Sequence, residues 1–343
     1  MSIAVEDNNK LSRLTNPGPD EQLRAILEGS SFDDYNSPLF IAWQINSACN
    51  LGCLHCCEEA GHSMPDEMTK EQALDFCRQI AELNIPYMAI SGGEPLLCPY
   101  IFDVCKFIRE NNISLKIETN GEFIDEKVAG QLAELKLRSV QVSLDGATAA
   151  AHERLRVAGD WKKAIEACEH LVNYGVNTEI VFVPTKFNIH EIGDAIDMAY
   201  SMGAYGFYTG KTMRIGRAAK NWDILCPSEE EYEKFFDVLQ KKTAAYEGKM
   251  KVYYYPYDVI EELKYRLEAP SASLLVVPNG KVKLIGPLPF ICGDLKKESL
   301  SRIWENYKKA WQNPEVIEFT RKVIADPKLL AESNNWRELN SES

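Results

Sequence analysis

The chain of 343 residues is 45% hydrophobic and 26% charged, which is typical of a globular protein with one large domain or two modest ones. A chain of this length buries roughly three quarters of its unfolded surface. Its fold therefore does not depend on disulfides, and its ten cysteines need another explanation. Lys and Arg number 38 against 51 Asp and Glu, and the resulting net charge of −13 disfavours nucleic acid or an anionic membrane as a partner.

Neither a membrane span nor a signal peptide is predicted. No apolar run reaches the roughly 18 to 20 residues that a transmembrane helix requires. The first ten residues are polar and acidic, without a basic start or an apolar core. We therefore expect a cytoplasmic protein, and in a reducing compartment clustered cysteines favour metal binding or redox chemistry over disulfides.

The first 217 residues alternate between two kinds of segment. Residues 1–38 are predicted to form an N-terminal arm with a short helix at Glu21–Leu27. From residue 39, β-branched and aromatic runs alternate with segments whose apolar residues recur every three or four positions. The predicted strands are Leu39–Ile45, Tyr87–Ser91, Ser114–Glu118, Ser139–Leu144, Thr178–Val183 and Tyr205–Met213. The predicted helices are Thr69–Leu83, Tyr100–Asn111, Asp125–Leu135, Trp161–Tyr174 and His190–Met202. This order predicts an α/β fold over residues 39–217, in which helices cover a parallel sheet. Functional residues are then expected at the carboxyl ends of the strands.

The pattern changes after residue 217, and residues 218–343 are predicted to form a smaller α+β cap domain. A Gly between two apolar runs indicates a hairpin. The predicted elements are a helix that opens at Pro227-Ser228, a hairpin of Leu274–Val277 and Lys281–Ile285 around Pro278-Asn279-Gly280, and one helix from Leu300 to about Val323.

A C-x3-C-x2-C loop follows the first predicted strand and consists of Cys49, Cys53 and Cys56. Three thiolates within eight residues can converge on one soft metal centre. The spacing alone is compatible with an iron–sulfur cluster or with zinc, which usually takes a fourth ligand. The candidates for that fourth ligand are Cys57, His55 and His62.

Three further motifs follow in order, each at the end of a predicted strand. They are Ser91-Gly92-Gly93-Glu94-Pro95, Thr119-Asn120-Gly121 and Ser143-Leu144-Asp145-Gly146. Together with the cysteine loop, they resemble the radical SAM family over about residues 39–217. The resemblance implies a partial (βα)6 TIM-like barrel whose three cysteines hold one [4Fe–4S] cluster, with S-adenosylmethionine (SAM) on the open iron. It also implies reductive cleavage of SAM to a 5′-deoxyadenosyl radical, fed by a donor such as flavodoxin or ferredoxin.

The same resemblance assigns SAM-binding roles to residues on these loops. They are Gly92, Gly93, Glu94, Pro95, Asn120, Ser143, Asp145, Arg156 and Val183. The glycines would admit the methionine amino group, Arg156 would pair with the SAM carboxylate, and Val183 would pack on adenine. The residues alone leave plainer roles open, namely a tight turn, a surface charge and core packing.

The C-terminal segment resembles the SPASM or twitch extension of radical SAM maturases. In place of a cysteine that ligates an auxiliary cluster there, this chain has Ile285. Cys226 and Cys292 are the cysteines outside the barrel, and two thiolates do not complete a four-ligand cluster. We therefore expect one cluster in total, with Cys226 and Cys292 as structural thiols or as hydrogen donors to a substrate radical.

The expected activity is that of a radical SAM oxidoreductase or maturase that removes hydrogen from a substrate carbon. Modification of a ribosomally made peptide or natural product is the first expectation. The alternative is a dehydrogenase or epimerase of a small molecule such as an aminocyclitol or a sugar. A non-catalytic zinc or iron–sulfur interaction module is the alternative from another class, although such a module has no use for SAM-binding loops.

Overall fold

The computed structural model describes residues 32–339, so the predicted helix at Glu21–Leu27 lies outside the described part. The described strands form one eleven-stranded sheet with the order β11-β10-β9-β8-β1-β2-β3-β4-β5-β6-β7. The strands are β1 Phe40–Gln44, β2 Tyr87–Ser91, β3 Ser114–Thr119, β4 Ser139–Ser143, β5 Thr178–Val181, β6 Gly206–Gly210, β7 Lys251–Tyr255, β8 Ser273–Val276, β9 Lys281–Lys283, β10 Phe290–Asp294 and β11 Arg337–Glu338.

The helices fall into two groups along the chain. Between the parallel strands lie α3 Lys70–Glu82, α4 Ile101–Glu110, α5 Glu126–Glu134, α6 Ala149–Leu155, α7 Trp161–Asn173, α8 Ile192–Ser201, α9 Arg217–Lys220, α10 Trp222–Leu225 and α11 Glu229–Ala245. The later helices are α12 Val259–Glu268, α13 Leu300–Ala310 and α14 Pro314–Ala325, and the 3₁₀ turns are η1 Phe32–Asp34, η2 Pro95–Leu97, η3 Ile189–Glu191 and η4 Pro327–Glu332.

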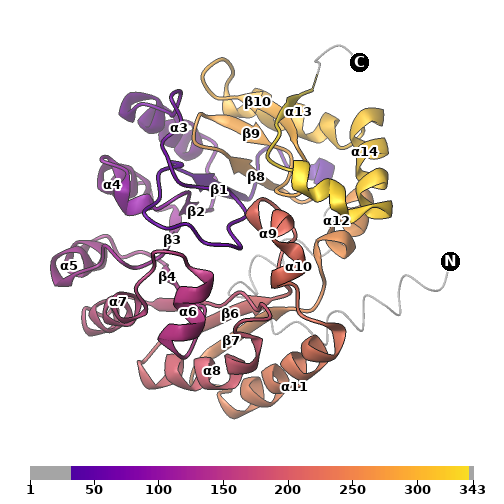
Figure 1. Ribbon diagram of the computed structural model, residues 1–343. Coiled ribbons are helices and arrows are strands. Elements are labelled where there is room, and N and C mark those ends of the chain that lie inside the picture. The colour runs from indigo at the N-terminus through magenta and orange to yellow at the C-terminus, as the bar shows by residue number, and fades with distance from the viewer. Residues whose placement is uncertain (1–31, 340–343) are drawn as a thin grey trace.

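Strands β1 to β7 are parallel, which confirms the predicted α/β class. In Figure 1 the helices α3, α4, α5, α7, α8 and α11 follow one another around the outside of the curved sheet. The seventh strand, β7, is not predicted, because four tyrosines within five residues (253–257) give no apolar alternation to read. It extends the barrel sheet beside β6.

The two faces of the sheet differ in polarity. Leu115 and Ile117 of β3 are fully buried in the core under the helices, whereas Lys116 and Glu118 alternate with them and lie on the opposite face. The same core holds Trp43 of β1, whose ring meets that of Phe76 of α3 edge-on at 5.1 Å between centroids. The outer face thus supplies the hydrophobic core, and the inner face is free to carry chemistry.

The C-terminal strands continue the sheet at the strand that precedes the cysteine loop. β8 pairs with β1 in parallel and with β9 in antiparallel orientation, which confirms the predicted hairpin. The single helix predicted from Leu300 to Val323 is wrong, because the chain forms α13 and α14 instead. Asn313 caps α14 by accepting a bond from Glu315 N (2.8 Å), and Pro314, without an N–H, occupies the first turn.

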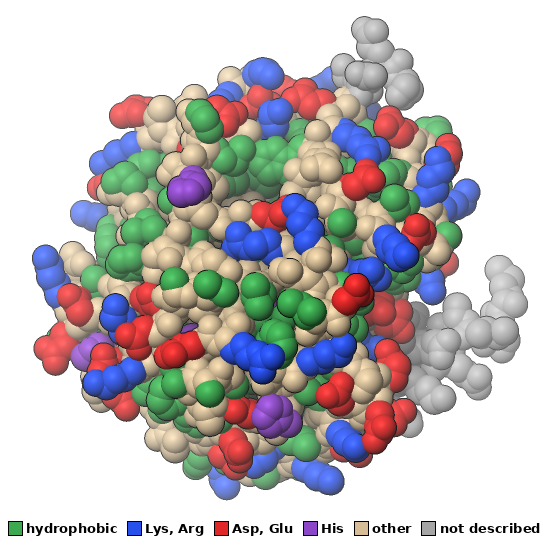
Figure 2. Space-filling view, viewed as in Figure 1, with side chains coloured by type: hydrophobic (Ala, Val, Ile, Leu, Met, Phe, Trp, Pro, Cys, Tyr) green, Lys and Arg blue, Asp and Glu red, His purple; other side chains and the backbone are tan. Residues whose placement is uncertain are grey.

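No helix within residues 32–339 is long and apolar enough to cross a bilayer. Basic and acidic side chains are interspersed over the face of the molecule seen in Figure 2.

Candidate functional site

The cysteine loop begins just after β1 and rests on the turn that follows β2. Gly93 N donates to Asn46 O (2.8 Å) and Glu94 N donates to Ala48 O (2.7 Å). Gly92 has φ +144°, and a Cβ at Gly93 would lie 2.1 Å from Ala48 O. Only glycines allow the two backbones to approach so closely, so this pair first serves to dock the cysteine loop.

Glu94 ties the β2 turn to the end of β3. Its carboxylate is fully buried and accepts bonds from Thr119 Oγ1 (2.8 Å), Leu96 N (3.0 Å) and Asn120 N (2.8 Å). Burial raises the pKa of Glu94, and these donors act in the opposite direction. The protein itself thus bonds to both carboxylate oxygens, and Pro95 begins the short turn η2 beside them.

Asp145 connects the ends of β4 and β5 to the cysteine loop. Its carboxylate is fully buried; Oδ1 accepts from Val183 N (2.7 Å), and Oδ2 accepts from Arg156 Nε (2.7 Å) and lies 3.3 Å from His55 Nε2. Burial alone would raise the pKa of Asp145, but Arg156 holds it below its ordinary value. Arg156 is only 7% exposed and its Nη1 lies 3.8 Å from Cys53 Sγ, so it is not a surface charge.

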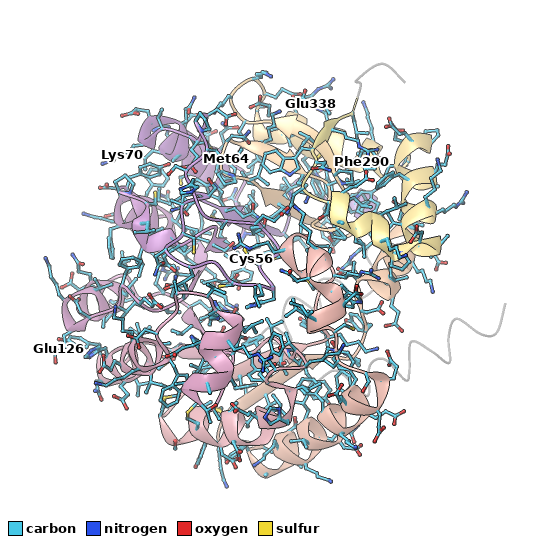
Figure 3. The ribbon with its side chains drawn as sticks, viewed as in Figure 1. Cys56, Met64, Lys70, Glu126, Phe290 and Glu338 are labelled. Atoms are coloured by element: carbon cyan, nitrogen blue, oxygen red, sulfur yellow. The ribbon has the colours of Figure 1, made fainter. Side chains whose placement is uncertain are left out.

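The three cysteines of the loop are free thiols, with Cys53 buried and Cys49 and Cys56 half-buried. Burial is the main cause that raises the pKa of Cys53 to about 11; Arg156 acts in the opposite direction, and Cys56, Asp145 and Cys49 add smaller increases. Cys56 lies in the middle of the view in Figure 3, beside α9, where Arg217 N donates to Cys56 O (2.9 Å). No three His, Cys, Asp or Glu side chains of residues 32–339 are already placed to hold a metal ion.

Two buried polar atoms beside the loop have no hydrogen-bond partner within the described chain, namely His55 Nδ1 and Asn46 Oδ1. Burial lowers the pKa of His55 to about 4, so its imidazole is neutral near pH 7. Buried polar atoms normally find partners. These two atoms therefore fit a polar ligand bound next to the cysteines.

The other predicted residues are more scattered. Ser143 is half-buried at the end of β4, and the side-chain amide of Asn120 donates to Asn50 Oδ1 (2.8 Å) of the cysteine loop. Cys292 is buried in β10 and donates to Val282 O (3.3 Å), and burial raises its pKa. Cys226, at the end of α10, donates to Pro227 O (3.3 Å).

Two residues that brace the loop are not predicted from the sequence. Arg217 donates from Nε to Cys53 O (2.9 Å) and from Nη1 to Ala60 O (2.8 Å). Glu122 accepts from Asn50 Nδ2 (2.7 Å). Both are far from the loop in sequence and belong to no motif, so no local pattern could identify them.

Residues 43–199 match the model of the Radical SAM superfamily. These residues form a radical SAM domain. Among curated relatives, the mycofactocin maturase MftC of Mycobacterium ulcerans is 31% identical over 214 residues, covering 60% of this chain and 56% of the relative. The AdoMet-dependent heme synthase of Methanosarcina barkeri is 24% identical over 293 residues, covering 79% and 83%. This chain thus spans a little over half of the length of MftC.

Solved structures of the superfamily share the fold. SuiB of Streptococcus suis bound to S-adenosylmethionine gives a TM-score of 0.66 at 16% identity, covering 92% of this chain and 78% of SuiB. The enzyme anSMEcpe with bound AdoMet and the Cp18Cys peptide gives 0.59 at 18% identity, covering 82% and 81%. These likenesses support the partial barrel. The family match ends at residue 199, so the SPASM or twitch resemblance of the C-terminal segment stays a prediction.

Proposed function

We propose that this chain is a radical SAM enzyme that holds one [4Fe–4S] cluster through Cys49, Cys53 and Cys56. The observation that carries the proposal is the set of three free thiols on one loop at the carboxyl end of β1, in the part of the chain that matches the superfamily. Three thiolates leave one iron open for SAM. When bound, the cluster would pass one electron from the electron donor to SAM, and the resulting 5′-deoxyadenosyl radical would remove hydrogen from an unactivated carbon.

The buried charges of Arg156 and Asp145 beside the cysteine loop favour metal binding by its thiols. Thiols must ionise to become ligands. The guanidinium of Arg156, 3.8 Å from Cys53 Sγ, lowers the pKa of that thiol against the effect of burial. Asp145 fixes Arg156 in place, and the braces from Arg217 hold the backbone of the loop.

We assign the SAM-facing roles to backbone and short polar groups. The turn of Gly92 and Gly93 receives the methionine end, while Glu94 positions this turn, because the protein itself bonds to its carboxylate oxygens. Asn46 Oδ1 and His55 Nδ1 supply hydrogen-bond acceptors without competing partners in the described chain.

Four more residues that the family resemblance assigns to SAM binding are part of the proposal. Pro95 shapes the turn, Ser143 and Asn120 contact the ribose or carboxylate, and Val183 packs on adenine with its half-buried side chain.

A peptide is the proposed substrate. The relatives include maturases by name, and one solved SuiB structure contains the precursor peptide SuiA, at a TM-score of 0.66 and 15% identity with this chain. We propose reaction in the cytoplasm with a flavodoxin or ferredoxin as electron donor. A small aminocyclitol or sugar substrate is the less supported alternative.

The test is anaerobic reconstitution followed by iron, sulfide and 5′-deoxyadenosine assays with dithionite and SAM. Wild-type protein should bind about four iron ions per chain, as this cluster type requires, and should form deoxyadenosine. The Cys49→Ala/Cys53→Ala/Cys56→Ala variant should do neither. Cys57→Ala, which removes the neighbouring thiol that donates to Glu58 Oε1 (3.5 Å), is the matched control and should keep both. Deoxyadenosine formation by the triple variant would overturn the proposal.

A further inference from the structure

The inner face of the barrel sheet is unusually polar. Barrels of parallel strands are ordinarily filled by branched apolar side chains. Here alternation along the strands places polar residues on the face opposite the helices. We refer to them as the interior polar cluster, which consists of Gln44, Lys116, Glu118, Gln141, Glu179 and Tyr208. Glu118 and Gln141 are register partners on β3 and β4, and Gln141 and Glu179 are partners on β4 and β5, so these three side chains lie in a row.

This cluster carries a surplus negative charge. Lys116 Nζ lies 3.0 Å from Glu179 Oε2 and 3.8 Å from Glu118 Oε1, so one ammonium faces two carboxylates. Glu179 is 1% exposed and has the closer contact with Lys116. The side chain of Glu118 is 39% exposed and keeps an accessible carboxylate.

Two amides of the cluster lack partners. Gln44 and Gln141 are 4% and 6% exposed, and neither side-chain amide forms a hydrogen bond within the described chain. Gln141 lies between the two carboxylates, and Gln44 is the last residue of β1, directly before the cysteine loop. Two largely buried glutamines in line with an accessible carboxylate fit a ligand that offers both a cation and hydrogen-bonding groups.

We propose that the interior polar cluster binds the protonated amine or guanidine of the substrate. Glu118 accepts hydrogen bonds from this cation, while Gln44 and Gln141 bond to polar groups on either side of it. The inference rests on the proposed function, because it holds the substrate at the end of the sheet where the cysteine loop lies. A lysine or arginine side chain of a peptide and a small aminated metabolite share this chemistry.

The experiment titrates reconstituted full-length protein with cationic and matched anionic probes by calorimetry. The peptide probes are the methylamides of Nα-acetyl-lysine, Nα-acetyl-arginine and Nα-acetyl-glutamate, and the small probes are cadaverine and glutarate. The variant Glu118→Gln removes the accessible charge and leaves Lys116 paired with Glu179. The control Glu126→Gln makes the same change at an exposed position of α5.

Cationic probes should bind and anionic probes should not. Glu118→Gln should weaken cation binding about tenfold or more, as expected for a charge-assisted hydrogen bond, and Glu126→Gln should leave it unchanged. Preference for lysine or arginine methylamide over cadaverine identifies a peptide, and the reverse identifies a small amine. Three results would overturn the proposal. They are equal binding of the anionic probes, unchanged cation binding by Glu118→Gln, and no binding of any cationic probe at about 10 mM, a concentration on the order of the weakest specific dissociation constants. Deoxyadenosine formation without substrate, measured on the same samples, tests the proposed function separately.

Discussion

At the scale of single residues, Asp145 explains how four distant positions become one site. The resemblance to the radical SAM family assigns roles to Asp145, Arg156, Val183 and Cys53 separately. The bonds that join them depend on tertiary structure, because Asp145 and Val183 are 38 residues apart and Arg156 and Cys53 are 103 apart. The sequence therefore predicts membership of the site better than the role of each member.

Asn in place of Asp145 should destabilise the protein strongly. Asp145→Asn keeps the shape but leaves Arg156 buried without its counter-charge, and breaking a buried pair in this way costs about 3 to 5 kcal/mol. Urea unfolding at pH 7 measures the loss. The control is Asp103→Asn, which breaks an exposed pair with Lys70 (2.7 Å) and should cost about 1 kcal/mol or less. Similar losses in the two variants would contradict this account.

Lys283 gives a pH-dependent prediction. The residue is 2% exposed; its ammonium donates to Gly286 O (2.7 Å) and Asn334 Oδ1 (3.2 Å), and burial lowers its pKa to about 8. The unfolded chain, with an ordinary lysine pKa of about 10.4, therefore binds more protons between these two values. Burial of Lys283 is thus most costly below pH 8, and this cost declines as the pH rises.

Wild-type protein should consequently gain stability relative to Lys283→Met between pH 7 and pH 9.5, by about 2 kcal/mol. Urea unfolding of both proteins across this range checks the difference. A constant difference would mean that Lys283 titrates with an ordinary pKa in the fold.

At the scale of elements, the alternation of apolar and polar residues and the helix-capping residues predict most helices and strands well. Thr69 caps α3 by accepting from Gln72 N (3.3 Å), close to where the sequence places the start of that helix. The predictions fail where regular patterns compete with local chemistry. Pro314 divides an apolar pattern into two helices, α6 is too short to show a period, and β6 ends at Gly210 before the predicted Met213.

The docking of the cysteine loop on the β2 turn is also a property of elements. Gly93→Ala should displace the loop, because the new Cβ would lie 2.1 Å from Ala48 O and that backbone atom cannot give way cheaply. We expect iron content after reconstitution to fall by more than half, and stability to fall by about 1 to 3 kcal/mol as in other overpacked sites. Gly61→Ala is the control on the same loop, since a Cβ there meets nothing within 4 Å. Full iron loading in Gly93→Ala would refute the docking role.

At the scale of the whole molecule, the C-terminal segment is joined to the site rather than attached beside it. β8 pairs with β1, the strand that leads into the cysteine loop. Asn334 Nδ2 donates to Cys57 O (2.9 Å), and Gly216 N donates to Ser333 Oγ (3.4 Å). The sequence indicates a change of pattern at residue 217, but sheet order and these distant contacts follow only from the assembled fold.

This arrangement leads to a prediction about how many clusters the molecule holds. Ile285 stands where an auxiliary ligand is expected, Cys292 packs in the core with its thiol bonded to Val282 O, and Cys226 bonds to Pro227 O. Wild-type protein should therefore bind about four iron and four sulfide ions per chain, as one [4Fe–4S] cluster requires. The Cys226→Ala/Cys292→Ala variant should bind the same amounts, although the loss of a buried thiol at Cys292 should lower its stability. Iron and sulfide assays with urea unfolding separate the two effects. Eight iron ions in wild type, or a loss of iron in the double variant at temperatures where it is folded, would show that the C-terminal cysteines ligate a second cluster.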